Sequence, residues 1–370
     1  MNTTPHSLVK QEVLDLFQAA ANVNLGSAYA GAWGTVGSFE TAYLGKHSHD
    51  STSIAVGDAS IFDLASLSKI LATTSAVMVL FERGILDLDA PLETYLPSEC
   101  SQYPHLKLLT LKQLLSHTSG LPAWKPFYED LKTEFGSLLA TESVAKRKSF
   151  FFSKVFETHP EAVAGERVVY SDLGFLIVGY LLEKISPHAL PDLMKNLVWS
   201  QISGVNLHYR PVLIESAQAI DPTVVATELC PWRGLLQGQV HDDNTWSMGG
   251  VAGHAGVFGT LNDVVAWANG LMSGKIVSQS TLRTFLSEVN LNSGVGSRRT
   301  IGFDMPSLDG SGTTGNAFSI NSVGHLGFTG TSLWIDLDSG DIACLLTNRV
   351  HPSRNDLRIR NLRINFHSTV

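Results

Sequence analysis

A long apolar segment, FDLASLSKILATTSAVMVLF (62–81), most constrains how this chain can fold. Gly84 ends the segment, and its length and composition predict a buried helix that begins at Ser66. Ser66 stands three residues before Lys69, so both side chains lie on one face of that helix. A lysine is out of place in a helix that serves only as core packing. The segment therefore points to chemistry as well as to burial.

The composition limits the classes of partner. The chain has 370 residues, of which 44% are hydrophobic, enough for one large domain or two lobes. Its formal charge is −8 and it has no dense Lys/Arg block, so we expect no binding of nucleic acid or of an anionic membrane. We expect a small-molecule or peptide substrate instead. The composition leaves the oligomeric state open.

The cysteines and the N-terminus carry few signals. Cys100, Cys230 and Cys344 are odd in number and far apart, which predicts neither a disulfide framework nor a metal site, and no cofactor motif is present. The first residues lack the features of a secretory signal, and no run reaches the roughly 20 apolar residues of a membrane helix. We therefore expect a cytoplasmic protein without membrane insertion, or a periplasmic one if a leader has been removed.

Strand signals gather at the two ends of the chain. GSAYAGAWGTVG and FETAYLGKHS follow a helix predicted over residues 8–20, and TSLWIDLDSGDIACLLTNRV predicts a hairpin near the other end. The middle is mostly helical. We therefore predict one α+β domain over 1–370, with an antiparallel sheet flanked by helices and an inserted, mostly helical lobe. The α/β lobe would span about 1–60 and 285–370, the helical lobe about 61–284, with a cleft between them.

Ser66 and Lys69 form a candidate nucleophile and base. A serine hydroxyl needs a nearby base, and a lysine of pKa about 10.4 must lose its proton to act as one. Burial at a helix N-terminus is expected to lower the pKa of Lys69. The same short pattern recurs at Ser7 and Lys10, where a helix cap and a solvated side chain explain it.

Two further segments carry candidate catalytic groups. Tyr170, followed by Ser171 and Asp172, precedes another apolar helix, and a tyrosinate there could act as base and later as acid; a core tyrosine is the alternative. In VGHLGFTGTSLWIDL (323–337) the glycines allow a backbone N–H to approach a developing oxyanion, and His325 adds a polar or cationic side chain. A glycine-rich strand at a sheet bend is the alternative there.

The ordered set SLSK (66–69), YSD (170–172) and HLG (325–327) resembles the serine β-lactamase and penicillin-binding-protein superfamily. It is most similar to the branch of class C β-lactamases, D,D-peptidases and serine carboxylesterases, and LLSHTSGLP (114–122) and GVAGHAGVFGTLNDVVAW (250–267) also resemble that branch. The resemblance spans about residues 25–350.

The resemblance implies a role for each matched residue. Ser66 would be the acylated nucleophile, Lys69 its proton acceptor, and Tyr170 the group that passes the proton to the leaving group. The backbone N–H groups of Ser66 and Phe328 would form the oxyanion hole. His325 would take the place of the family's strand lysine or histidine.

Several residues are candidates for substrate contacts. Leu326 and Gly327 would lie against the substrate, but Leu326 stands where relatives often carry a threonine that helps to hold a substrate carboxylate. Arg349 or Arg354 could replace that contact. Asp172 stands in place of a frequent asparagine, which alters the hydrogen bonding offered to a substrate amide.

Two other segments carry weaker functional signals. His47 and His49 in HSHD (47–50) lack the further histidine that a zinc site needs. The segment CPWRGLLQGQVHDDNTWSMGG (230–250) either lines the cleft or only connects packed elements, and the sequence leaves both open.

These features predict a serine hydrolase that acts through a Ser66 acyl-enzyme on an amide or ester. A peptidoglycan-derived peptide or muropeptide, or a small ester, is the expected substrate. The alternative is a penicillin-binding sensor that is acylated without turnover. The presence of Ser66, Lys69 and Tyr170 together favours the enzyme.

Overall fold

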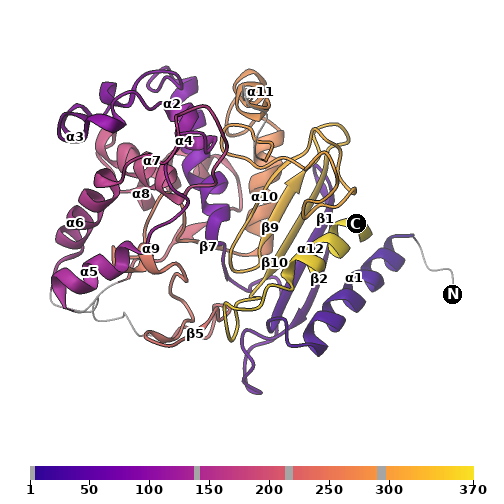
Figure 1. The fold of residues 1–370 in the computed structure, drawn as a ribbon. Coiled ribbons are helices and arrows are strands. Elements are labelled where there is room, and N and C mark those ends of the chain that lie inside the picture. The colour runs from indigo at the N-terminus through magenta and orange to yellow at the C-terminus, as the bar shows by residue number, and fades with distance from the viewer. Residues whose placement is uncertain (1–4, 137–141, 213–219, 290–296) are drawn as a thin grey trace.

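The computed structural model describes residues 5–136, 142–212, 220–289 and 297–370 (Figure 1). The α-helices are α1 (Pro5–Asn22), α2 (Ser75–Glu82), α3 (Pro97–Gln102), α4 (Leu111–Leu115), α5 (Phe127–Phe135), α6 (Val144–Glu157), α7 (Asp172–Ile185), α8 (Leu190–Leu197), α9 (Asp243–Ser247), α10 (Leu261–Met272), α11 (Gln279–Leu286) and α12 (Ile359–Thr369). The strands are β1 (Ala28–Thr35), β2 (Ser38–Gly45), β3 (Phe62–Asp63), β4 (His208–Tyr209), β5 (Leu229–Cys230), β6 (Gly234–Leu235), β7 (Val257–Gly259), β8 (Val323–Leu326), β9 (Ser332–Ile335) and β10 (Asp341–Thr347).

The main sheet joins strands from both ends of the chain. Its order is β2-β1-β10-β9-β8, and all of its strand pairs are antiparallel. The hairpin predicted near the C-terminus forms β9 and β10, and β8 adds the edge strand that carries His325 opposite Leu333. The predicted α+β fold with an antiparallel sheet is confirmed. The lobe boundaries near residues 60 and 285 stay a prediction.

Helices cover both faces of this sheet. Tyr29 and Trp33 of β1 belong to a core formed with α1 and α12, whereas the alternate residues Ala30 and Ala32 belong to the larger core on the other face. Figure 1 shows α1 and α12 together on one side of the sheet and α10 on the other. The face that does not carry α1 and α12 therefore meets the helical part of the chain.

The buried helix of residues 65–82 is less regular than predicted. A 3-10 turn (Ala65–Leu67) and a π-helical stretch (Lys69–Thr74) precede α2. Side-chain donors satisfy carbonyls in this stretch: Trp199 Nε1 donates to the carbonyl of Leu71 at 2.9 Å and Ser75 Oγ to that of Ile70 at 2.7 Å. The whole segment is long and apolar enough to cross a membrane, yet 83% of it is buried inside the fold, as a core helix is.

The helix α1 begins at Pro5, so Ser7 lies inside it. The interpretation of Ser7 as the cap of the first helix is therefore wrong. Helix boundaries depend on long-range packing as well as on capping residues, and here α1 packs along β2 and α12.

Backbone contact joins α7 to the loop that follows residue 250. A Cβ at Gly179 would lie 2.8 Å from both Cα and the backbone nitrogen of Gly253, so the two glycines let the helix and the loop approach closely. The carbonyl of the next residue, His254, accepts a hydrogen bond from Lys69 Nζ at 3.3 Å. The contact between Gly179 and Gly253 therefore helps to hold in place the carbonyl of His254 that accepts this hydrogen bond.

Replacing Gly179 tests the backbone contact. Alanine within a helix is normally more stable than glycine by about 1 kcal/mol, but at this position the added methyl meets the backbone of Gly253. We expect Gly179→Ala to lower the free energy of unfolding by about 1–3 kcal/mol in urea denaturation. Gly57→Ala is the matched control, because nothing lies within 4 Å of its added methyl. Equal stability of the two variants would contradict the close approach.

Candidate active site

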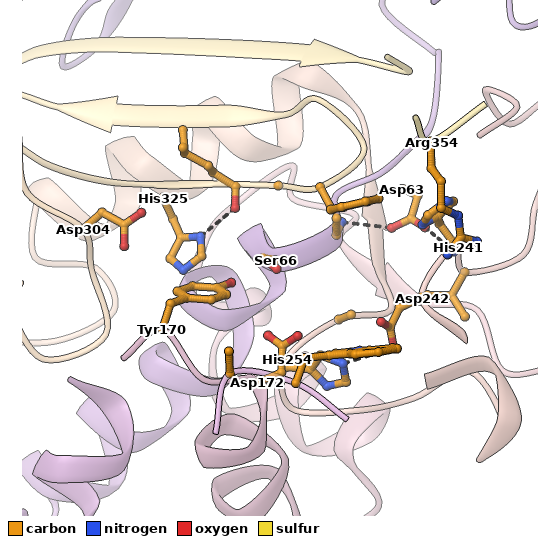
Figure 2. Close-up of a pocket in the computed structure, with 18 of the residues that line it drawn as sticks. Asp63, Ser66, Tyr170, Asp172, His241, Asp242, His254, Asp304, His325 and Arg354 are labelled. Carbon is orange, nitrogen blue, oxygen red and sulfur yellow. Dashed lines mark hydrogen bonds and ion pairs between the residues drawn. The ribbon is translucent and has the colours of Figure 1, made fainter. Parts of the chain in front are cut away.

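A cavity of about 670 Å³ lies where the edge strand β8 faces the helical part of the chain. The predicted site residues Ser66, Tyr170, Asp172, His325, Leu326, Gly327, Phe328, Arg349 and Arg354 all line it. Figure 2 shows Ser66 in the middle, with Tyr170 and His325 on one side. Lys69 lies fully buried behind Ser66. The fold therefore brings together residues that are far apart in the sequence, such as Ser66 and Arg354, which are 288 positions apart.

Ser66 is presented by a strained turn. Ala65, the residue before it, has φ of 48°, a left-handed conformation that is uncommon for a residue with a Cβ. Its backbone N–H donates to Asp63 Oδ1 at 2.9 Å, which holds the turn. Lys69 Nζ lies 3.0 Å from Ser66 Oγ. The amine is therefore within reach of the hydroxyl proton.

Lys69 has a carboxylate partner that changes its titration. Lys69 Nζ lies 2.7 Å from Asp172 Oδ1. Burial lowers the pKa of Lys69, but the charge of Asp172, followed by Tyr170, outweighs burial, and the pKa lies above its ordinary value. The expectation of a lowered pKa is therefore wrong, because it ignored Asp172. Asp172 lines the cavity, so its predicted contact with the substrate stays a prediction, and the structure adds its contact with Lys69.

Tyr170 is held by His117, a residue to which the sequence assigned no separate role. The rings of His117 and Tyr170 lie 4.6 Å apart between centroids. His117 Nδ1 accepts the N–H of Ser171 at 2.9 Å, and its carbonyl accepts the N–H of Val169 at 2.9 Å. Both neighbours of Tyr170 are thus fixed to one residue. His117 belongs to the segment LLSHTSGLP, which was the available signal.

Burial raises the pKa of Tyr170, while Lys69 and Ser66 act in the opposite direction. The net shift is upward, so the phenol carries its proton at neutral pH. Lys69 Nζ lies 5.0 Å from the centre of the phenol ring. A protonated tyrosine beside Ser66 can donate its proton to a departing group.

An ion pair lies beside Tyr170. The guanidinium of Arg299 lies 5.3 Å from the centre of the Tyr170 ring and pairs with Asp304. The ring of His325 is 5.9 Å from that of Tyr170, and its Nδ1 lies 2.8 Å from the carbonyl of Leu326. Burial lowers the pKa of His325 to about 4, so its ring is neutral at neutral pH. No short motif marked Arg299 or Asp304 in the sequence.

Two arginines hold the turn after β8. Arg349 Nε donates to the carbonyl of Phe328 at 2.7 Å, and its guanidinium lies 4.3 Å from the centre of the Phe328 ring. Arg363 Nη2 donates to the carbonyls of Gly327 and Thr331, each at 2.7 Å. Arg349 was expected to contact a substrate carboxylate, but these bonds give it the role of a positioning residue for Phe328.

Arg354 is also engaged within the protein. It pairs with Glu228 at 2.6 Å and with Asp243 at 3.0 Å. This network contains part of the segment 230–250, whose residues Val240, His241, Asp242 and Asp243 line the cavity. The segment 230–250 therefore lines the cavity and also connects packed elements, so both interpretations that the sequence left open are correct.

The HSHD segment (47–50) makes structural contacts. His47 Nε2 lies 2.8 Å from Ser60 Oγ and its Nδ1 lies 3.0 Å from the carbonyl of Pro222. Over the described ranges 5–136, 142–212, 220–289 and 297–370, the structure contains no group of three or more His, Cys, Asp or Glu side chains arranged to hold a metal ion. Hydrogen bonds within the fold therefore account for His47.

The sequence profile of the β-lactamase family matches residues 19–365. This chain belongs to the β-lactamase family. The family identifies it as a serine hydrolase, in agreement with the site built around Ser66. A protein of Salmonella agona (strain SL483) named "Putative D-alanyl-D-alanine carboxypeptidase" is 27% identical over 346 residues, which cover 86% of this chain and 75% of that protein.

Solved structures share the fold over nearly the whole chain. The hydrolase EstCE1, named for promiscuous acyltransferase activity, aligns with a TM-score of 0.74 at 18% identity, covering 98% of both chains. A penicillin-binding protein from Bacillus halodurans aligns with a TM-score of 0.66 at 18% identity, covering 90% of this chain and 94% of that one. The D-amino acid amidase from Ochrobactrum anthropi SV3 aligns with a TM-score of 0.68 at 16% identity, covering 98% and 97%.

Removing the Asp172 charge tests its effect on Lys69. Because Asp172 raises the pKa of Lys69, Asp172→Asn is expected to lower that pKa, so that neutral amine forms at lower pH. The rate at which a fluorophosphonate labels Ser66 should then rise at lower pH than in the wild type. Asp130→Asn, which removes an exposed carboxylate from α5, is the control and should leave the profile unchanged. An unchanged or upward-shifted profile for Asp172→Asn would contradict the assignment.

Proposed function

We propose that this chain hydrolyses an ester or amide through an acyl-enzyme on Ser66. The observation that carries the proposal is the contact of Lys69 Nζ with Ser66 Oγ at 3.0 Å, beside a protonated Tyr170. Ser66 Oγ attacks the substrate carbonyl and its proton moves to neutral Lys69. Because Asp172 keeps most of Lys69 charged at neutral pH, the reactive form is a minority and the rate should climb toward alkaline pH.

The remaining groups complete the reaction. The backbone N–H groups of Ser66 and Phe328 stabilise the oxyanion of the tetrahedral intermediate. Tyr170 gives its proton to the leaving group as the bond to the carbonyl carbon breaks, and Lys69 returns a proton to Tyr170. In the second half a water attacks the acyl carbon, and its proton passes through the same groups to Ser66 Oγ as the bond between Oγ and that carbon breaks. This step releases the acid and restores Ser66.

The proposed substrate is a peptidoglycan-derived peptide or muropeptide, or a small ester. The name of the Salmonella relatives supports the former, and the names of the solved hydrolase and amidase support ester and amide chemistry. The cavity of about 670 Å³ is large enough for a small peptide or an ester of similar size. A cytoplasmic location and the lack of a nucleic-acid or membrane partner stay predictions from composition.

Three substitutions test the proposed groups. Ser66→Ala is expected to abolish labelling by a fluorophosphonate, acylation by penicillin and release of p-nitrophenol from p-nitrophenyl esters, because the variant lacks the hydroxyl that forms the adduct. Lys69→Ala and Tyr170→Phe should each slow acylation by about 10² or more, the usual scale for losing acid–base help. Intact mass spectrometry and product release are the measurements.

The second Ser-x-x-Lys copy supplies a matched control. Ser7→Ala and Lys10→Ala carry the same changes in α1 and should retain wild-type rates. A Ser66→Ala protein that still forms the adduct would refute the nucleophile. A stable Ser66 adduct without product release would instead support the sensor that is acylated without turnover.

A further inference from the structure

The two ends of the cavity differ in their chemistry. Figure 2 shows Tyr170, His325 and Asp304 on one side of Ser66, with Asp63, His241 and Arg354 on the opposite side. A leaving group must depart toward the residue that protonates it, which in the proposed mechanism is Tyr170. The end beside Tyr170 is therefore the leaving-group side.

Both cations beside Tyr170 already have carboxylate partners. Lys69 pairs with Asp172 at 2.7 Å, and Arg299 pairs with Asp304. The carboxylates are also the more accessible partners: the side chains of Asp172 and Asp304 are 17% and 18% exposed, compared with 0% and 8% for Lys69 and Arg299. An incoming group at this end therefore meets carboxylate oxygens more readily than the charges that balance them.

Among the residues that the structure describes, the other walls of this end carry positive charge only on buried arginines. His325 is neutral, and Leu326 presents an apolar side chain. Arg349 and Arg363 are 5% and 7% exposed and donate to backbone carbonyls of the turn after β8. A carboxylate on the leaving group would thus meet the accessible oxygens of Asp172 and Asp304 before it reached any of these buried cations, and this contact between like charges is unfavourable.

We propose that the leaving-group side selects substrates whose leaving group lacks a carboxylate, such as an uncharged alcohol or a blocked amine. The inference rests on the proposed function and narrows it. Release of a free terminal amino acid, which carries a carboxylate next to the scissile bond, is disfavoured. Esters of neutral alcohols, and amides whose leaving amine has a blocked carboxyl group, are favoured.

A matched pair of substrates tests this on the wild-type protein. Phenylacetylglycyl esters of lactic acid and of lactamide have the same acyl group and the same scissile ester, and differ only in a carboxylate or a carboxamide on the leaving group. We expect kcat/KM for the lactamide ester to exceed that for the lactate ester by about tenfold or more. Equal values, or a preference for the lactate ester, would overturn the inference.

A variant assigns the preference to Asp304. Asp304→Asn removes one carboxylate and leaves the Arg299 charge unbalanced, so the preference for the lactamide ester should fall by about tenfold. Asp221→Asn is the control, because it breaks the Arg210–Asp221 ion pair of 2.6 Å outside the cavity and should keep the wild-type ratio. If Asp304→Asn does not fold, the wild-type comparison decides alone.

The outcomes separate the two proposals. Failure of a fluorophosphonate to label Ser66 would refute the proposed function, and with it the inference. Labelling of Ser66 together with hydrolysis of both esters at equal rates would refute only the inference. Labelling without hydrolysis of the lactamide ester would also count against it, because the site should accept that small neutral leaving group.

Discussion

The ion pair between Lys69 and Asp172 is the interaction on which the site depends. A fully buried ammonium is strongly unfavourable without a partner, and Asp172 provides one at 2.7 Å. The pair also joins the head of the buried 65–82 segment to the first residue of α7. Tyr170 lies two residues before Asp172, so the same contact that balances the charge of Lys69 brings the phenol close to Ser66.

Local patterns made part of this site predictable. Ser66 and Lys69 are one helical turn apart, and Tyr170 lies just before an apolar helix, so local patterns marked them as candidates. The resemblance of the three ordered motifs to a known family then implied their roles. The antiparallel sheet was predictable for a similar reason, because β9 and β10 form a hairpin around a short turn signal. Each of these features depends on residues that are close in sequence.

The rest of the site depends on contacts between distant segments. The pKa of Lys69 lies above its ordinary value because of a residue 103 positions later, and no pattern around Lys69 reveals that. Arg299 and Asp304 reach the cavity from a region without a recognisable motif. The sequence predicted a lowered pKa for Lys69 because burial is visible in a hydrophobic pattern. The ionic partner that raises this pKa is not visible there.

The Arg349 contacts behind the turn after β8 couple the backbone of Phe328 to its side chain. Its backbone is held from behind by Arg349, while its side chain is 50% exposed at the cavity. The same arginine thus fixes the backbone of Phe328 and supports the ring that lines the cavity. A substitution of Phe328 would therefore also change the packing of Arg349, so the shape of the cavity and the position of this turn do not vary independently.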